Sequence, residues 1–412
     1  MAVPSPPRAT AGEESHGRTA FEVADVVRAY GASFLSTHPT SGAQRRVLRA
    51  IGRCRTVALG GHVEGCDACG HTRIAYNSCR NRHCPKCQGQ QRAKWMAAEQ
   101  AMLLPTEYFH VVFTLPHALT PLIRVNPRAL YGLLFRAAAA TLLAFARDPT
   151  HLGGEPAITM VLHTWGQTLT EHAHVHCVVS GGGLSADACR WQSTKRRGFL
   201  FPVRALSKLF RGKYLAALDR LQRTGALRLA GQSTRFSEAS NWVQFHAELR
   251  RTTWVVYAKP PFGGPECVLK YLSRYTHRVA LSNRRLLFVG DGVVRFTWKD
   301  YADHHATKEM TLSAEEFLRR FLLHVLPRGF MRIRHYGILA NRHREPKLRR
   351  CRELLGVPTP LPPQPALTGP DPDPQRDAPD ERDTERSPTP CPNCGAPMRV
   401  VELLAPRPWD TS

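Results

Sequence analysis

The chain has 412 residues, 42% of them hydrophobic, which is enough for a sizeable core and for two or three domains of ordinary size. Its 57 Lys and Arg residues outnumber 33 Asp and Glu residues, a formal net charge of +24 that favours a nucleic acid partner, with an anionic membrane or ribosomal surroundings as alternatives. The N-terminus has no apolar segment typical of a secretory signal, and the longest apolar run, Leu133 to Ala146, is interrupted by Arg136 and is too short to cross a bilayer. We therefore expect a cytoplasmic protein.

The predicted elements of the N-terminal half begin after a polar, disordered segment over residues 1–20. Two helices follow, and Ser41 can cap the second of them. The strand YFHVVFTL is short, aromatic and β-branched, and it ends at Pro116. Pro127 suits the first turn of an alanine-rich helix. The expected helices cover 21–35, 42–53, 88–104 and 127–147, and the expected strands cover 108–115, 157–165 and 174–180.

The C-terminal half continues with mixed helices and strands. Asp291-Gly292 between two apolar runs predicts a β-hairpin over 284–300. Helices are expected over 208–222, 263–278 and 313–326, and a strand over 252–258. From Thr359 the chain is rich in Pro and Asp and cannot bury enough apolar surface to fold. Because helices and strands do not alternate regularly, we expect an α+β fold with a central antiparallel sheet flanked by helices.

A cysteine-rich block predicts zinc binding between residues 54 and 87. Two CxxC pairs each present two thiolates to one ion, so Cys66, Cys69, Cys84 and Cys87 are expected to form one tetrahedral site. The remaining ligands could form a second site, and both sites would be structural. Two alternatives are open. The ligands could be shared between the two sites in a cross-brace, or a single zinc could be bound, with Cys54, His62 and His83 as ordinary core or surface residues. The second expected ligand set is Cys54, His62, Cys79 and His83, while the terminal pair Cys391 and Cys394 has no visible partner pair.

A pair of histidines and a pair of tyrosines are candidate catalytic or metal-binding residues. His174 and His176 alternate along an expected strand, so both imidazoles project from one face and can share a metal ion, although histidines on a wet sheet face would show the same alternation. Tyr271 and Tyr275 lie four residues apart, so their hydroxyls leave one face of an expected helix; alone, such a pair is usually core packing.

Together, these motifs resemble the HUH-type transposases of rolling-circle insertion sequences, the two-tyrosine class related to the common-region elements. His174-Val175-His176 matches the His-apolar-His motif, Tyr271 and Tyr275 match the two tyrosines, and the similarity covers about Cys54 to Leu355. The implied organisation is a disordered N-terminus over 1–20, a helical and zinc-binding DNA-contacting module over 21–95, a catalytic domain over 96–355, and a disordered tail with a CxxC knuckle over 356–412.

The resemblance implies that the protein nicks and rejoins single-stranded DNA, at the ends of a mobile element and in target DNA. A tyrosine would attack the scissile phosphate and form a 5′-phosphotyrosine, with Mg²⁺ or Mn²⁺ at the histidines; imidazole suits manganese better. The third metal ligand is open between His172, which we favour, and Glu171, Gln167 and His163.

Two alternatives remain. A plasmid relaxase or replication initiator would use the same chemistry, but no GxxxxGK[ST] motif is present and the zinc block precedes the catalytic part, which favours a transposase. A zinc-dependent DNA-binding regulator would have the same charge and cysteines, with structural histidines and tyrosines. Zn²⁺, in one or two structural sites, is expected under each of these functions.

Overall fold

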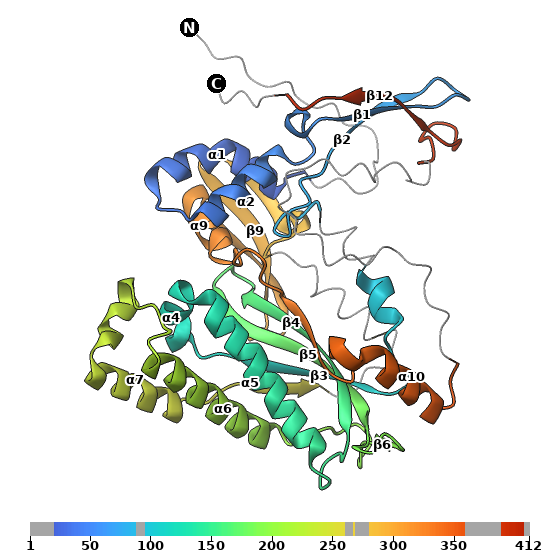
Figure 1. Ribbon diagram of the computed structural model, residues 1–412. Coiled ribbons are helices and arrows are strands. Elements are labelled where there is room, and N and C mark those ends of the chain that lie inside the picture. Colours follow the sequence, from blue (N-terminus) through green and yellow to red (C-terminus); the bar gives the residue numbers. More distant parts are fainter. Residues whose placement is uncertain (1–19, 88–94, 260–266, 268–279, 359–388, 408–412) are drawn as a thin grey trace.

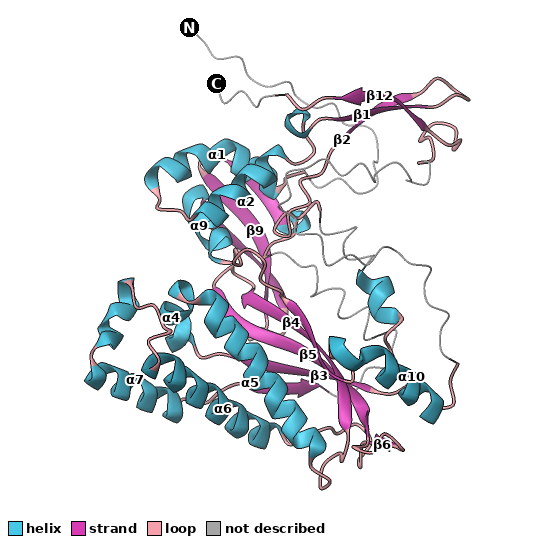
Figure 2. Ribbon diagram, viewed as in Figure 1, coloured by secondary structure: helices cyan, strands magenta, loops and turns pink. Residues whose placement is uncertain are grey.

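The computed structural model describes residues 20–87, 95–259, 267, 280–358 and 389–407. The expected helix over 263–278, including Tyr271 and Tyr275, lies outside the described residues except for Cys267. The described part of the chain combines helices with antiparallel sheets (Figures 1 and 2), so the expected α+β fold is confirmed.

The largest sheet is antiparallel and has the strand order β11-β4-β5-β3-β7, with β6 paired to β5. Its two central strands, β4 and β5, are the longest, and both are buried over most of their length. The strands are β3 (Tyr108–Thr114), β4 (Glu155–Trp165), β5 (Glu171–Leu184), β6 (Trp191–Ser193), β7 (Val256–Lys259) and β11 (Ile333–Gly337).

One face of this sheet forms the main core. Val175, Cys177 and Val179 of β5 point into it and are fully buried. Helices α5 (Pro127–Arg147) and α6 (Val203–Arg223) cross this face in Figure 1, and α4 (Thr120–Val125) and α7 (Ala239–Arg251) pack beside them. By length and composition α5 alone among the described helices could span a membrane, but 67% of its apolar window is buried inside the protein, as in a core helix.

A second core joins segments that are far apart in the sequence. Helices α1 (Val23–Thr37) and α2 (Gly42–Arg53) pack with α9 (Ala314–Leu323) against the sheet β10-β9-β8. Ser41 caps α2 as expected, by accepting a hydrogen bond from the backbone N–H of Gln44. The three strands are β8 (Leu286–Gly290), β9 (Val293–Asp300) and β10 (Ala306–Ser313).

The second core contains residues from both sides of the expected boundary between residues 95 and 96. The helices expected in the zinc-binding module share their core with residues 280–322, which were expected in the catalytic domain. The reason is the narrow apolar stripe of α1 and α2, which needs a partner surface that the small cysteine-rich block cannot provide. Leu169, from the loop between β4 and β5, is fully buried in the same second core.

A third sheet brings the two ends of the described chain together. β12 (Arg399–Leu404) pairs antiparallel with β1 (Gly61–Gly65), which also pairs with β2 (Thr72–Tyr76). Figure 1 shows this ribbon beside α1 and α2. Residues 389–407, expected within a disordered tail, are therefore ordered against the cysteine-rich block.

Helix α10 (Arg344–Leu354) closes the end of the main sheet, where Leu348 packs with Ala157 and Leu184. The chain reaches α10 through Gly337, the last residue of β11. Gly337 has a φ of +62°, and an added Cβ would lie 2.0 Å from the carbonyl oxygen of Pro156. Only glycine fits this close approach of β11 to β4.

Candidate metal centre and cysteine clusters

The two histidines of the HxH pattern lie on β5, on the face opposite the main core. Their neighbours Val175 and Cys177 point into that core, so strand alternation forces His174 and His176 to the other side. Both imidazoles are nevertheless buried, with 9% and 7% of each residue exposed. Their Nε2 atoms are 3.1 Å apart, close enough for both to bind one ion.

Hydrogen bonds orient both rings. Nδ1 of His174 donates to the backbone carbonyl of His172 at 2.7 Å, which leaves Nε2 of His174 with its lone pair. Nδ1 of His176 lies 2.8 Å from Nε2 of His110, on the neighbouring strand β3. When His176 donates this hydrogen bond through Nδ1, its Nε2 also carries a lone pair, so both Nε2 atoms can bind the same ion.

The third imidazole in the group belongs to His163 on β4. His163 pairs in register with His174, and His163, His174 and His176 offer ligand atoms that all lie within 4.8 Å of one another. Among the described residues, the group contains His163, one of the open alternatives, and not His172, the third ligand that we favoured from the sequence. Although its ring packs near that of His174, His172 does not join the group; it also faces His117, with 5.6 Å between ring centroids.

Two other candidates for the third ligand have different partners. The carboxylate of Glu171 forms a bidentate ion pair with Arg124. The side chain amide of Gln167 donates to the hydroxyl of Tyr301 at 2.9 Å. The β4–β5 register shifts between His163 and Trp165, so Glu171 pairs with Trp165 and does not continue the regular alternation of the histidines.

Burial favours the neutral form of His174 and of the neighbouring His110. It lowers the pKa of His174 to about 3, with smaller contributions from His172 and His110. It lowers the pKa of His110 to about 4, assisted by the positive charge of Lys259. Neutral rings retain the lone pairs that metal binding requires.

The sequence reasoning missed His110. The available signal was a polar histidine in the middle of the buried strand YFHVVFTL, where His110 is only 2% exposed. A buried histidine needs a hydrogen-bond partner, but which strand supplies it depends on the pairing of β3 with β5. That pairing could not be read from periodicity.

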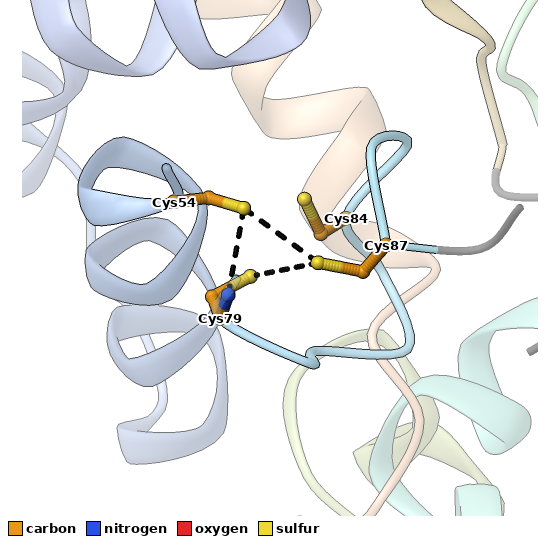
Figure 3. A group of neighbouring side chains, drawn as sticks. All are labelled: Cys54, Cys79, Cys84 and Cys87. Atoms are coloured by element: carbon orange, nitrogen blue, oxygen red, sulfur yellow. Dashed lines mark hydrogen bonds between the residues drawn. The ribbon is translucent and has the colours of Figure 1, made fainter. Parts of the chain in front are cut away.

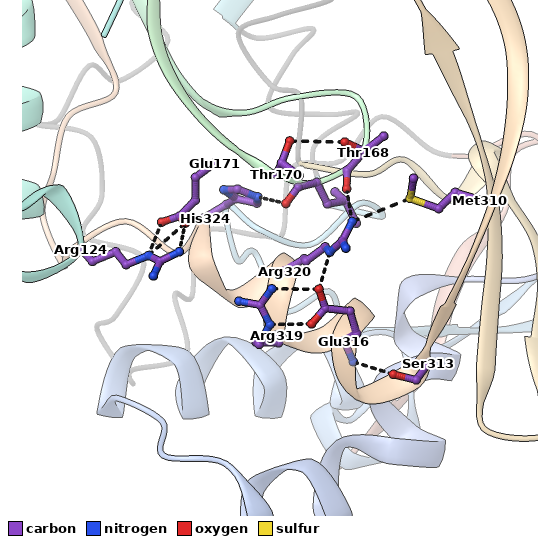
Figure 4. Close-up of polar contacts among 11 residues, drawn as sticks. Arg124, Thr168, Thr170, Glu171, Met310, Ser313, Glu316, Arg319, Arg320 and His324 are labelled. Carbon is purple, nitrogen blue, oxygen red and sulfur yellow. Dashed lines mark hydrogen bonds and ion pairs between the residues drawn. The ribbon is translucent and has the colours of Figure 1, made fainter. Parts of the chain in front are cut away.

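The loop that precedes the histidine strand is fixed to α9 by polar contacts (Figure 4). Arg320 donates to the carbonyl of Thr168 at 3.1 Å and is held by Glu316. His324 donates from Nε2 to the carbonyl of Leu169 at 3.0 Å. The start of β5 is thus anchored to the second core.

Four cysteines form a compact group at the junction of α2 and the cysteine-rich block (Figure 3). Cys87 Sγ lies 3.6 Å from the sulfurs of both Cys54 and Cys79, and Cys84 completes the set. Four sulfurs bound tetrahedrally to zinc at ~2.3 Å lie about 3.8 Å apart, whereas a disulfide would require ~2.05 Å. This first cysteine cluster therefore fits a closed Zn²⁺ site.

A second cysteine cluster has one pair from each end of the chain: Cys66, Cys69, Cys391 and Cys394. Both clusters differ from the expected ligand sets, since Cys66 and Cys69 do not join Cys84 and Cys87. The sequence spacing was compatible with either pairing, and the choice depends on β12, which was not predicted.

The two histidines expected as zinc ligands lie outside both clusters. His62 Nε2 is 3.4 Å from a carboxylate oxygen of Glu64 on the same strand. His83 is half-buried, and desolvation together with Arg82 and Arg332 lowers its pKa to about 3. All-sulfur clusters leave no position for these imidazoles.

Comparisons with known proteins agree with this arrangement. A transposase zinc-binding domain model, Zn_Tnp_IS91, matches residues 26–115, and a model described as "Putative transposase", Y2_Tnp, matches residues 157–347. A "Putative transposase y4qJ" of Sinorhizobium fredii is 52% identical over 402 residues, covering 96% of this chain and 100% of the relative. The transposase for insertion sequence element IS801 of Pseudomonas savastanoi pv. phaseolicola is 30% identical over 318 residues. The match covers 75% of this chain and 73% of the relative. No solved structure matches.

The zinc-binding domain and the sheet domain thus define a transposase of an insertion sequence. The chain belongs to the IS91/IS801 family of transposases, a rolling-circle family. The matched zinc-binding domain contains all four residues of the first cysteine cluster, but only Cys66 and Cys69 of the second.

Proposed function

We propose that this transposase nicks and rejoins single-stranded DNA through a 5′-phosphotyrosine, with a divalent metal held by His163, His174 and His176. The observation that supports the proposal best is the convergence of three buried imidazoles on one point. A DNA-binding regulator has no need of such a group, because burying three imidazoles costs free energy that a structural role alone does not require.

The donor set fits a divalent transition metal. Imidazole nitrogens suit Mn²⁺ better than Mg²⁺, which prefers oxygen ligands. When bound, such an ion would polarise a non-bridging phosphate oxygen and orient the phosphate. His110 and the carbonyl of His172 have a positioning role, since they fix the tautomers of the two β5 histidines.

The proposed nucleophile is the phenol of Tyr271 or Tyr275. Its oxygen bonds to phosphorus while the bond to the 3′-oxygen breaks; the phenol gives up its proton and the leaving 3′-oxygen gains one. A 3′-hydroxyl can later reverse the step without ATP, because the phosphodiester bond energy is kept. Two tyrosines would allow cleavage of a donor strand and its joining to a target.

Lys259 is suited to hold the DNA backbone near this site. It pairs in register with His110 across β3 and β7, so its side chain leaves the sheet on the histidine face. Its charge acts on His110, which agrees with that position. A single strand is the expected substrate, since one backbone has to reach this face without its partner.

The decisive experiment labels DNA strands copied from both ends of the element that encodes the chain. With Mn²⁺, a 3′-labelled strand should become covalently attached to the protein, and a 5′-labelled strand should be shortened without attachment. Mass spectrometry should find the adduct on the peptide that contains Tyr271 and Tyr275. Phe substitutions assign each tyrosine, and Tyr76→Phe on β2 is the matched control. Binding without cleavage would favour the regulator, and an adduct that persists in the Y271F/Y275F double variant would refute the assignment.

A further inference from the structure

The second cysteine cluster joins the two ends of the chain. Cys66 Sγ is 3.5 Å from Cys394 Sγ, and Cys69 Sγ is 3.6 Å from Cys391 Sγ. Each sulfur of one pair thus faces a sulfur of the other, and all four lie within 4.8 Å of one another. These separations match the edges of a zinc tetrathiolate, about 3.8 Å, and exclude disulfides.

The two pairs sit on turns with the same internal hydrogen bonds. In CDACG, the N–H of Gly70 donates to the carbonyl of Cys66 at 2.9 Å, and the N–H of Cys66 donates to the carbonyl of His71 at 2.9 Å. In CPNCG, Gly395 donates to Cys391 at 2.9 Å, and Cys391 donates to Ala396 at 2.7 Å. The repeated motif therefore folds into two equivalent knuckles.

The glycine after each pair allows this turn to form. Gly70 has a φ of +69° and Gly395 a φ of +75°, a conformation that other residues rarely adopt. Two such knuckles facing each other are the arrangement expected of a four-sulfur zinc ribbon.

The strands beside the knuckles support the same pairing. β12 lies along β1 from Gly61↔Leu404 to Gly65↔Arg399, and Arg399 binds the carboxylate of Asp67 within the first knuckle at 2.8 and 2.9 Å. Among the residues that the structure describes, the local apolar core contains Cys66, Cys391, Met398 and the partly buried Ala396. A core this small needs an additional cross-link to be stable.

From these observations we propose that Cys66, Cys69, Cys391 and Cys394 bind a second Zn²⁺ ion, which fastens the C-terminal strand to the N-terminal zinc module. Cys391 and Cys394 are more than 320 residues away from Cys66 and Cys69 in sequence, so the ion closes the chain into a ring. The two sites differ in accessibility. The first cluster includes three buried cysteines, whereas Cys69 and Cys394 of the second are exposed. A chelator should therefore remove the second ion first.

Metal analysis of the full-length chain tests the proposal. The wild-type protein should carry two zinc ions, one for each cysteine cluster. The C391S/C394S variant and the C66S/C69S variant should each carry one, and the quadruple variant should also carry one, because both pairs serve the same ion. Cys189→Ser, at an exposed cysteine outside both clusters, is the control and should retain two.

A second measurement uses the wild-type protein, so its result does not depend on whether the cysteine variants fold. Amide hydrogen exchange of residues 399–404 in the wild-type protein should accelerate on mild chelation, before the residues around Cys84 respond. Two zinc ions in C391S/C394S would overturn the proposal, as would a quadruple variant with fewer ions than either pair variant. Unchanged exchange in β12 after loss of the first zinc equivalent would also contradict it.

Discussion

Nε2 of His110 lies 2.8 Å from Nδ1 of His176, so a histidine from β3 sets the orientation of a histidine on β5. His110 has no place in the HxH pattern and does not belong to the three-histidine group. Its ring is stacked nearly parallel to that of His176, with centroids 5.1 Å apart. The candidate metal centre thus takes its three imidazoles from β4 and β5, and β3 supplies the histidine that orients one of them.

His110→Ala should weaken Mn²⁺ binding by about 10- to 100-fold, because the ring of His176 loses the acceptor that fixes its tautomer. Titration calorimetry with Mn²⁺ measures the effect. His38→Ala, on a histidine that stacks on Phe34 in the second core, is the control and should bind Mn²⁺ normally. Normal Mn²⁺ binding by the His110 variant would show that the contact has no positioning role.

The third ligand can be identified by comparing two substitutions. His163→Ala should abolish Mn²⁺ binding and DNA cleavage as thoroughly as His174→Ala, since both remove a member of the converging group. His172→Ala should have a much smaller effect, because His172 contributes its backbone carbonyl, which the substitution retains. A larger loss of Mn²⁺ binding and DNA cleavage in His172→Ala than in His163→Ala would identify His172 as the ligand.

Zinc content should distinguish the cysteine clusters from the ligand sets expected from sequence. His62→Ala and His83→Ala should leave zinc content unchanged, since neither residue lies in a cysteine cluster. Cys84→Ser should lose one zinc ion and also lower thermal stability, because Cys54, Cys84 and Cys87 form part of the second core. Loss of zinc from either histidine variant, measured by elemental analysis, would argue against the all-sulfur sites.

Gly337→Ala should destabilise the fold strongly. Its positive φ alone costs a non-glycine residue about 1–2 kcal/mol. Gly225→Ala is the matched control, because Gly225 has a φ of +65° and open space around its Cβ position. The clash with Pro156 should add about 1–3 kcal/mol to the unfolding free energy lost at Gly337. Urea unfolding measures both, and equal losses would mean that β11 can move away from β4.

Acid should destabilise the contact between the second core and the histidine strand. Burial lowers the pKa of His324 to about 4, below its unfolded value of about 6.5. The unfolded state therefore binds more protons between these values, and stability falls as the pH drops from 6.5 to 4, by up to about 3 kcal/mol.

His324→Gln should lose this pH dependence while keeping one polar contact to the loop. The unfolding free energies of wild type and variant should thus converge toward pH 4 and differ most above pH 6.5. A parallel pH dependence of the two proteins would show that other groups dominate acid unfolding.

Much of the fold could be predicted from local patterns. The helices at α1, α2, α5 and α9 and the strands β3, β4, β5, β8 and β9 follow from apolar periodicity, capping by Ser41 and the Asp291-Gly292 turn. The placement of His174 and His176 on one strand face followed from alternation alone.

Long-range pairing could not be predicted in the same way. The position of His163 beside His174 depends on the register between β4 and β5. The partner of the CPNCG motif depends on β12 returning to β1, although the repeated CxxCG in CDACG was a visible signal. Local propensity contains no information on which of several equivalent cysteine pairs will meet.

The burial of Leu169 has a mechanical consequence. A turn between two adjacent antiparallel strands usually tolerates inserted residues, because its tip lies in solvent. Here the side chain of Leu169, at the tip of the turn, is buried in the second core. An insertion between Gly166 and Thr170 should therefore be poorly tolerated. Any rotation of α1, α2 and α9 as a unit would pull directly on the first residues of β5, a few positions before the imidazoles.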